Sequence, residues 1–274
     1  MRVKSRTHGL FELIQTIAFA LVVAMVPKIV FCQPFTIPSG SMEPTLLVGD
    51  YILVSKYAYG WSRHSLPLSL PLPQGRILAH APKRGDIVVF KEPRDGRTDI
   101  IKRLIGLPGD HIQVVGGVLQ INGRAVPRQK LGLSSEDGAF GAFAVTRYRE
   151  TLPNGRRYQV NSYGANTPAG DTGVYVVPAG CYFLLGDNRD NSADSRFDPG
   201  KTAPGQSACP WNPVLDRYLP AQEGAGFVPF EDLVGRADMV LLSWKPGASL
   251  LKPWTVPTGL RWDRSFHAIN ARAS

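Results

Sequence analysis

The chain has 274 residues, of which 43% are hydrophobic, so it can bury a substantial core and is not a disordered chain. Its formal net charge of +9 is compatible with binding to nucleic acid or anionic lipid, or with a role in solubility alone. The charge by itself therefore identifies no partner. The 28 glycines and 23 prolines separate short β-branched runs, a composition that favours strands and turns over long helices.

A hydrophobic segment follows a basic N-terminus. Residues 1–10 carry two arginines and a lysine, and residues 11–31 are almost entirely apolar. This segment is long enough to span a bilayer, and the basic residues before it predict a cytoplasmic N-terminus, with everything after residue 32 outside. A cleaved signal peptide is the alternative. Small residues should precede a cleavage site, however, and Phe31 is bulky, so we expect one uncleaved anchor.

Past the anchor, short apolar runs bounded by glycine, proline, aspartate or asparagine predict a mainly β fold. We expect strands within residues 50–58, 85–91, 99–107, 111–126, 173–187 and 232–244. Gly116-Gly117 and Asn122-Gly123 predict tight hairpin turns inside the fourth range. Proline-rich or polar connectors are expected at residues 65–75, 134–143 and 198–226, the last of them an insertion-like surface loop.

The sequence IPSGSMEP at residues 37–44 is a hydroxyl-rich turn placed directly before a predicted strand. Its prolines stiffen the turn, and Gly40 relieves the steric limits between Ser39 and Ser41. A hydroxyl and a backbone amide can then face one point, as acyl transfer requires. An ordinary solvated turn has the same composition, and the turn alone does not separate the two interpretations.

Lys102 lies in the third predicted strand, within the sequence DIIKRLIGLPGD. The period-two alternation of a strand places it on one face with Ile100 and Leu104. If that face is buried, the ammonium loses water, its pKa falls, and a neutral amine becomes available as a base near neutral pH. A lysine on an edge strand that reaches solvent is the plainer alternative.

Residues 186–198, GDNRDNSADSRFD, are dense in paired charge. Alternating carboxylate and amide oxygens would suit calcium, but the interleaved arginines and the lack of a closing glutamate argue against a calcium loop. A rigid ion-paired turn that holds a neighbouring group fits better. No histidine lies in any of these three segments, so a Ser-His-Asp triad has little support.

Three cysteines, Cys32, Cys181 and Cys209, show no CxxC spacing and have no histidine cluster nearby. A zinc site is therefore not expected, and without a glycine-rich phosphate loop we expect neither a metal nor another cofactor. Cys181 and Cys209 could pair in an oxidising compartment, and the sequence leaves that question open.

The segments PSGSMEPTL, RGDIVVFK with DIIKRLIGLPGD, and GDNRDNSADSR, in this order behind a hydrophobic N-terminus, resemble the bacterial type I signal peptidases, also called leader peptidases. The resemblance spans about residues 34–110 and 181–244. It implies an antiparallel-sheet catalytic core with an inserted smaller β domain. It also implies a serine endopeptidase that removes N-terminal signal peptides from exported preproteins, cleaving after small residues at the first and third positions before the bond.

The resemblance further implies roles for individual residues. Ser41 would be the nucleophile and Lys102 its general base, acting through an acyl-enzyme. The Ser39 hydroxyl and the Ser41 amide would form the oxyanion hole, and Ser192 would orient the lysine. The residues that match the group supporting the site are Arg103, Asp194 and Arg196. Those that match the substrate pocket are Pro34, Phe35, Ile37, Pro38, Ile100 and Ile101, with Ile100 standing where a tyrosine is common.

We expect the following parts: a cytoplasmic N-terminus at 1–10, a transmembrane anchor at 11–31, a catalytic β core at 32–110 and 181–250 with the loop 198–226, an inserted β subdomain at 111–180, and a basic tail at 251–274. The catalytic part would then lie on the periplasmic or extracellular side of the bacterial inner membrane. The expected partners are preproteins and, through the tail, anionic membrane lipid, with no nucleic acid.

Two other functions are compatible with parts of the sequence. A self-cleaving repressor protease also uses serine and lysine on a similar fold, but such chains begin with a DNA-binding helical domain rather than a hydrophobic segment. A catalytically inactive β domain, tethered to the membrane as a binding module, is the alternative from a different class. The joint presence of Ser39, Ser41, Lys102 and Ser192 argues against it.

Overall fold

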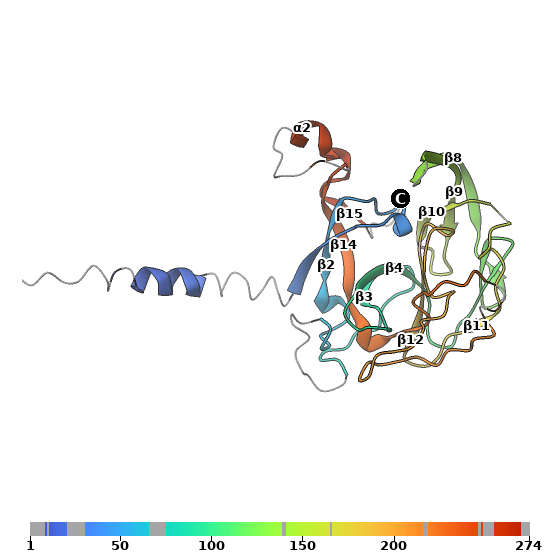
Figure 1. The fold of residues 1–274 in the computed structure, drawn as a ribbon, viewed down its shortest axis with the longest axis horizontal. Helices are drawn as coiled ribbons and strands as arrows, with labels where there is room; N and C mark the ends of the chain where they lie inside the picture. The colour runs from blue at the N-terminus through green and yellow to red at the C-terminus, as the bar shows by residue number, and fades with distance from the viewer. Residues whose placement is uncertain are drawn as a thin grey trace, which may run out of the picture.

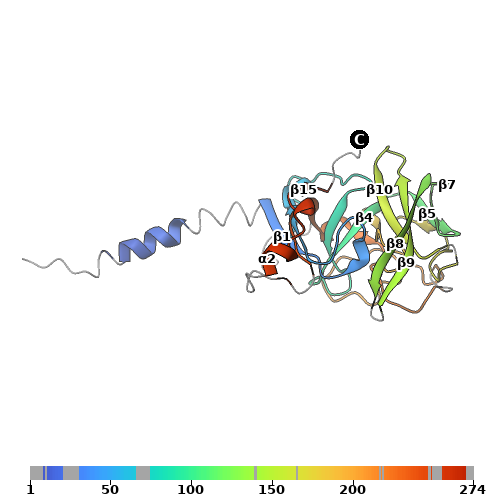
Figure 2. The same cartoon turned by 90° about the horizontal axis from the view of Figure 1, so that it is seen from above.

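The protein is described by a computed structural model, which covers residues 9, 11–20, 31–65, 75–138, 141–164, 166–215, 217, 219–245, 248 and 255–269. Its body consists mainly of antiparallel β-sheet, which confirms the prediction of a mainly β fold (Figures 1 and 2). Residues 11–20 are helical, and residues 21–30 of the expected anchor lie outside the described part. Within the described ranges, no helix is both long and apolar enough to cross a bilayer.

The main sheet has eight strands. In spatial order they are β1 (Cys32–Thr36), β2 (Asp50–Ser55), β14 (Leu233–Ser243), β3 (Ile87–Lys91), β4 (Asp99–Gly106), β12 (Cys181–Leu185) and β13 (Val228–Pro229), with β15 (His267–Ala268) paired to β14. β12 is buried along its whole length and β3 along all but its last residue, as their continuous apolar sequences CYFLL and IVVFK require. Each of these strands falls within a predicted range, except β1, β13 and β15.

Two smaller sheets stand beside the main one (Figures 1 and 2). One contains β11 (Tyr175–Val176), β5 (His111–Val115), β6 (Val118–Ile121) and β7 (Arg124–Ala125), and the other contains β10 (Arg157–Ser162), β9 (Gly141–Thr151) and β8 (Arg128–Gly138). Both hairpin turns predicted in the first sheet are confirmed. Gly116, Gly117, Asn122 and Gly123 all have positive φ, as a two-residue turn between twisted strands needs.

The core crosses the border between the sheets. One cluster of fully buried side chains joins Ile105 of β4 and Phe183 of β12 to Ile112 of β5 and Val160 of β10. All the strands of both smaller sheets lie within residues 111–180, so the chain segment expected to form a subdomain is packed into the same core as the main sheet. The two parts therefore share close-packed side chains and do not have separate cores.

The prediction of a connector at residues 134–143 is wrong. Residues 134–138 and 141–143 belong to strands β8 and β9, which pair as a hairpin from Arg128↔Glu150 to Gly138↔Gly141. The sequence here is polar and rich in glycine, which is typical of a connector. Several positions near the hairpin end, Leu133 among them, are exposed. The segment therefore lacks the alternation of apolar and polar residues that predicts a half-buried strand. This hairpin becomes important for the site below.

The loop 198–226 is attached to the core rather than lying free on the surface. Cys209 in the loop forms a disulfide with Cys181 at the start of β12, with the two Cα atoms 6.3 Å apart. Trp211 and Leu215 of the same loop pack, partly buried, against the cluster that joins the sheets. The pairing that the sequence left open is therefore formed, and it ties the loop to a buried strand.

The expected basic tail also differs from the prediction. Residues 267–268 extend the main sheet as β15, because they pair with Met239 and Val240 of β14. Arg264 donates to the buried carboxylate of Asp50 at 2.7 Å. The described part of the tail is thus attached to the main sheet through β14 and Asp50, whereas residues 251–254 and 270–274 lie outside the described part.

Breaking the disulfide should cost stability. A cross-link that spans 28 residues restricts the unfolded chain, so Cys181→Ser with Cys209→Ser should lower the free energy of unfolding by about 2–4 kcal/mol. Chemical denaturation under oxidising conditions measures this. Cys32→Ser, at the free cysteine, is the matched control and should leave the midpoint unchanged. Equal midpoints for the double variant and the control would contradict the assignment.

Candidate active site

Ser41 lies in a one-turn 3-10 helix, η1 (Gly40–Met42), between β1 and β2. Ser39, just before this turn, is extended with φ −129° and ψ 155°, and Glu43 closes the turn by donating its backbone N–H to the Gly40 carbonyl at 3.0 Å. The Ser39 and Ser41 hydroxyl oxygens are 3.5 Å apart. Ser39 is exposed and Ser41 is partly buried, so both hydroxyls lie at the edge of the solvent.

Lys102, in the middle of β4, reaches this turn. Its amine nitrogen Nζ is 2.6 Å from Ser41 Oγ, a short hydrogen bond between residues 61 positions apart in the sequence. The lysine is 4% exposed, so the strand face that carries it is buried. The alternative of a solvent-reaching edge lysine is excluded by this burial, although the backbone of Lys102 pairs only with Val88 of β3 and β12 begins to pair at Arg103.

Burial lowers the pKa of Lys102 from 10.5 to about 8. The carboxylates of Asp194 and Asp187 oppose this shift by attracting the ammonium, and the guanidinium of Arg196 adds to it. With a pKa of about 8, roughly a tenth of the molecules carry a neutral amine at pH 7, compared with about one in several thousand for a free lysine. The residue is therefore able to act as a base.

Arg103, the next residue on β4, does not bond the serine turn directly through Ser41 but forms an ion pair with Asp187. Its guanidinium donates two hydrogen bonds to the Asp187 carboxylate, at 2.7 and 2.6 Å, and stacks 4.2 Å over the ring of Tyr158. Thr45, in the loop after η1, also donates to Asp187. This buried ion pair fixes the segment after β12 to β4 and to the serine turn.

Asp194 and Arg196 form a second buried ion pair in the same charged segment. Arg196 Nε lies 2.9 Å from one Asp194 oxygen, and the Gly186 amide donates to the other oxygen at 3.1 Å. Burial alone would raise the pKa of Asp194, but Arg196 and the Gly186 amide hold it below its usual value. The resemblance grouped Arg103 with this pair, whereas its carboxylate in the structure is Asp187.

Asp187 lies in the charged segment 186–198, but the sequence predicted no role for it. It lies two positions after Leu185, which is the register partner of Arg103 between β12 and β4. Two local signals were present: a carboxylate one glycine after the apolar run CYFLL, and Arg103, which strand alternation places on the opposite face from Lys102. Using these signals requires knowing that the two strands are neighbours, which the sequence of each strand does not reveal.

Gly186 and Ser192 lie against the serine turn. A Cβ on Gly186 would be 2.6 Å from the Ser41 carbonyl oxygen and closer still to the Ser192 hydroxyl, so only glycine fits there. Ser192 is 7% exposed, and among the described residues its hydroxyl has no hydrogen-bond partner. Ser192 is thus close to the site, and its role in orienting Lys102 stays a prediction.

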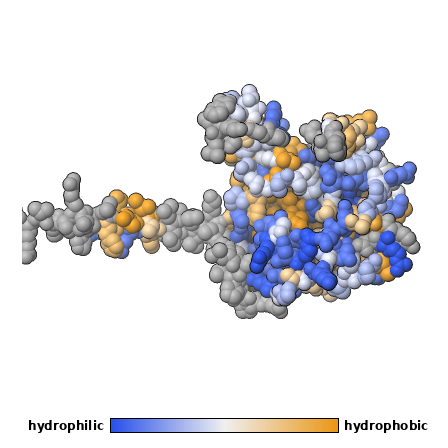
Figure 3. Space-filling model, viewed as in Figure 1, coloured by the Kyte–Doolittle hydropathy of each residue, from blue (hydrophilic) through white to orange (hydrophobic). Residues whose placement is uncertain are grey.

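Three of the residues that match a substrate pocket meet at the main sheet. Phe35 of β1 and Ile101 of β4 pack, partly buried, against the apolar cluster that contains Ile37 and Met42. Hydrophobic side chains are also visible over the main sheet on the face of the molecule drawn in Figure 3. An apolar surface of this kind is suited to apolar groups of a ligand.

The other three residues that match a substrate pocket are not part of that apolar cluster. Ile100 packs against the cluster that contains Tyr59 and Leu104, because successive residues of a strand point to opposite faces. Pro34 and Pro38 are exposed on either side of the end of β1. Their contribution to a substrate pocket stays a prediction.

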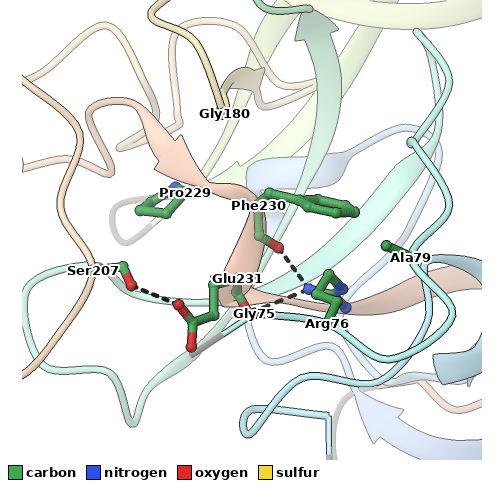
Figure 4. A pocket seen from close by; sticks show the side chains of 8 residues that line it. All are labelled: Gly75, Arg76, Ala79, Gly180, Ser207, Pro229, Phe230 and Glu231. Atoms are coloured by element: carbon green, nitrogen blue, oxygen red, sulfur yellow. Dashed lines mark hydrogen bonds between the residues drawn. The ribbon is translucent and has the colours of Figure 1, made fainter. Parts of the chain in front are cut away.

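A surface cavity of about 400 Å³ lies away from these residues and contains none of them (Figure 4). Its lining residues are Gly75, Arg76, Ala79, Gly180, Ser207, Pro229, Phe230 and Glu231. Arg76 donates to the Phe230 carbonyl at 2.6 Å, and Ser207 donates to the Glu231 carboxylate at 2.9 Å. The polar groups of the cavity are thus engaged in bonds that hold the backbone before β14. We therefore do not treat the cavity as a candidate active site.

A serine hydroxyl bonded to a desolvated lysine amine on an antiparallel sheet is the arrangement of a serine hydrolase that uses an amine as its base. The family described as "Signal peptidase, peptidase S26" matches residues 10–244. A "Signal peptidase I" from Rickettsia akari (strain Hartford) is 41% identical over 237 residues, which cover 83% of this chain and 78% of that protein. The chain therefore belongs to the signal peptidase family, peptidase S26.

Two further relatives can be compared. A "Signal peptidase I" from Rickettsia rickettsii (strain Sheila Smith) is 41% identical over 272 residues, covering 92% of this chain and 90% of that protein. A crystal structure of a signal peptidase I from Enterococcus faecalis V583 is 25% identical, with a TM-score of 0.29, and the match covers 57% of this chain and 97% of that chain. The family membership implied by the sequence motifs is confirmed.

Replacing Gly186 should separate the Ser41 hydroxyl from the Lys102 amine. The Cβ in Gly186→Ala would push against the Ser41 carbonyl, and misplacement of a nucleophile by about 1 Å costs on the order of 100-fold in rate. Turnover of a peptide ester by the full chain measures the loss. Gly173→Ala is the matched control, because its Cβ would meet only ordinary contacts. Equal turnover by both variants would show that Gly186 does not constrain the turn.

Proposed function

We propose that this chain is a membrane-anchored serine endopeptidase that removes N-terminal signal peptides from exported preproteins, with Ser41 as nucleophile and Lys102 as general base. The observation that carries the proposal is the 2.6 Å contact between Lys102 Nζ and Ser41 Oγ in a chain of the signal peptidase family. The buried lysine has a pKa of about 8, which makes it a base that works near neutral pH.

The reaction begins with proton transfer. Neutral Lys102 takes the proton from the Ser41 hydroxyl as Oγ attacks the peptide carbonyl carbon, and the carbonyl oxygen becomes an oxyanion. The Ser39 hydroxyl, 3.5 Å from Ser41 Oγ, and the Ser41 backbone N–H are the donors proposed to hold this oxygen. As the C–N bond breaks, the Lys102 ammonium returns its proton to the leaving amine, so the lysine is neutral again.

Deacylation repeats the same steps with water. Neutral Lys102 takes a proton from water, the resulting hydroxide attacks the ester of Ser41, and the lysine gives the proton back to Ser41 Oγ as the ester bond breaks. The ion pairs around Asp187 and Asp194 do not exchange protons in this scheme. They hold β4, the segment after β12 and the serine turn in one fixed arrangement.

Substrate binding in this proposal uses strand edges and the apolar surface. β1 is the edge strand of the main sheet, and β12 pairs with β4 only from Arg103 onward, so the backbone of residues 99–102 is not covered by β12. An extended peptide can pair with such edges. Its side chains at the first and third positions before the bond would face Phe35, Ile37 and Ile101, where limited space favours small residues.

The location follows from the N-terminal segment. We propose that residues 11–31 anchor the chain in the bacterial inner membrane, with residues 1–10 in the cytoplasm and the catalytic part on the outer side. Ser41 then lies only ten residues beyond the anchor, close to the surface where signal peptides emerge. Anionic lipid is the partner proposed for the basic residues of the C-terminal segment 251–274.

A cleavage assay tests the function directly. Detergent-solubilised full-length chain should process a precursor with an Ala-X-Ala site, whereas Ser41→Ala and Lys102→Ala should lower the rate by at least about 1,000-fold, since each removes a group that the first step requires. Lys83→Ala, at an exposed lysine, is the control and should retain full activity. Equal processing by all four proteins would mean that the chain is not a peptidase of this kind, and the inactive binding module would remain.

The pH dependence of kcat/KM tests the role of Lys102. Because burial lowers its pKa to about 8, the active neutral form should increase as pH rises, with a half-maximal value near pH 8. A rate profile over pH 6 to 10.5, measured where the protein stays folded, gives this midpoint. A rise centred near pH 10 would show that the base is an ordinary solvated lysine.

A further inference from the structure

Glu136 of β8 is a carboxylate buried next to the candidate site, with only 5% of its surface exposed. Its two oxygens accept hydrogen bonds from two asparagine amides, at 2.5 Å from Asn161 Nδ2 and at 2.7 Å from Asn188 Nδ2. Burial, and after it the negative charge of this carboxylate, raises the pKa of the nearby Tyr163 hydroxyl to about 12. Burying a charged group costs free energy unless it is well hydrogen-bonded. A buried carboxylate such as Glu136 is therefore expected to have a structural or functional role.

Asn188 connects Glu136 to the serine turn. Its Nδ2 also donates to the Gly40 carbonyl at 3.2 Å, and its backbone N–H donates to the Ser41 carbonyl at 3.1 Å. Since Glu136 and Gly40 each present an acceptor, only the amide nitrogen of Asn188 can face both. The two hydrogens of one amide group therefore bridge the β8–β9 hairpin and the turn that holds Ser41.

Asn161 strengthens the same bridge from β10. Its backbone N–H donates to the Asp187 carbonyl at 3.0 Å, and its own carbonyl accepts from the Arg189 amide at 3.0 Å. Its side-chain oxygen accepts from Arg147 of β9 at 3.1 Å. Glu136 thus lies where the small sheet of β8, β9 and β10 is hydrogen-bonded to the backbone of residues 187 and 189, which precede and follow Asn188.

We propose that Glu136 is a positioning residue, which fixes the Asn188 amide and through it holds the Gly40–Ser41 backbone so that the Ser41 hydroxyl stays against Lys102. The inference rests on the proposed function and extends it, because it makes the inserted small sheet part of what determines the rate. Glu136 touches neither the substrate nor Lys102 in this account.

The variant Glu136→Gln tests the proposal with little change of shape. A glutamine places an NH₂ group where a carboxylate oxygen accepted, so one asparagine amide loses its acceptor. We expect kcat for the precursor peptide to fall about tenfold, the effect of losing one hydrogen bond to a charged group. KM should stay within twofold, and the pH midpoint should not move, since the pocket side chains and the burial of Lys102 are unchanged.

A double-mutant cycle with Asn188→Ala tests whether Glu136 acts through Asn188. If Glu136 acts through Asn188, the double variant should be no slower than Asn188→Ala alone. Glu223→Gln, at an exposed glutamate, is the matched control and should leave kcat unchanged in either background. All rates are measured at a temperature at which thermal denaturation shows every variant fully folded. Should Glu136→Gln fail to fold, Asn188→Ala alone must lower kcat at least tenfold.

Amide hydrogen exchange provides a readout that does not depend on catalysis. In the full-length chain, Glu136→Gln should speed deuterium uptake in peptides that contain residues 186–192, where the Asn188 N–H binds the Ser41 carbonyl, and Glu223→Gln should not. If wild-type protein cleaves no precursor, the proposed function fails, and the exchange rates still decide whether Glu136 holds this segment.

Three results would overturn the inference. They are a kcat within twofold of wild type in Glu136→Gln, unchanged exchange at residues 186–192, and losses from Glu136→Gln and Asn188→Ala that simply multiply. A fall in melting temperature with an unchanged kcat would likewise show that Glu136 only stabilises the fold. In each of these cases wild type would still cleave and Ser41→Ala would not, so the proposed function would stand.

Discussion

A lysine amine kept out of water beside a serine hydroxyl is the constraint on which the rest of this structure depends. Holding the pKa of Lys102 near 8 instead of 10.5 costs the folded chain about 3 kcal/mol at pH 7, because the unfolded lysine binds its proton more tightly. Asp187 and Asp194 lie close enough to relieve that cost. Each is bonded to its own arginine, however, so neither pairs with Lys102, and the amine stays easy to deprotonate.

The surrounding architecture can be understood as a way of holding that contact in place. The main sheet supplies the lysine from its interior and the serine from the turn between two strands near its edge. Residues 186–196 supply both carboxylates, one of the two arginines that pair with them, and a glycine small enough to let the serine turn approach. The smaller sheets share the core of the main sheet. One of them, formed by β8, β9 and β10, contributes Glu136, Glu150 and Tyr158, which bind the same segment. A region that looks like an insertion in the sequence is therefore a support of the site in space.

The sequence was informative where the signal is local. Period-two alternation placed Lys102 on an apolar face, asparagine–glycine and glycine–glycine pairs located hairpin turns, and the order of three motifs identified the family. It was uninformative where partners are distant: the Arg103–Asp187 pair, the Cys181–Cys209 bond and the bridge from Glu136 join residues 84, 28 and 52 positions apart. The β8–β9 hairpin was missed because an exposed hairpin end carries no apolar pattern. The tail was misjudged because two residues, 267–268, suffice to extend a sheet.

The most direct test of the central claim is a titration of Lys102 itself. Lysine labelled with ¹³C at the ε-carbon can be followed by NMR against pH in the detergent-solubilised full-length chain, with Lys102→Arg identifying the signal. The account predicts one lysine resonance that titrates near pH 8, well separated from the solvated lysines near 10.4. If the Lys102 signal instead titrates together with the others, the amine is solvated at rest, and the proposed base would be charged at the pH where the enzyme must work.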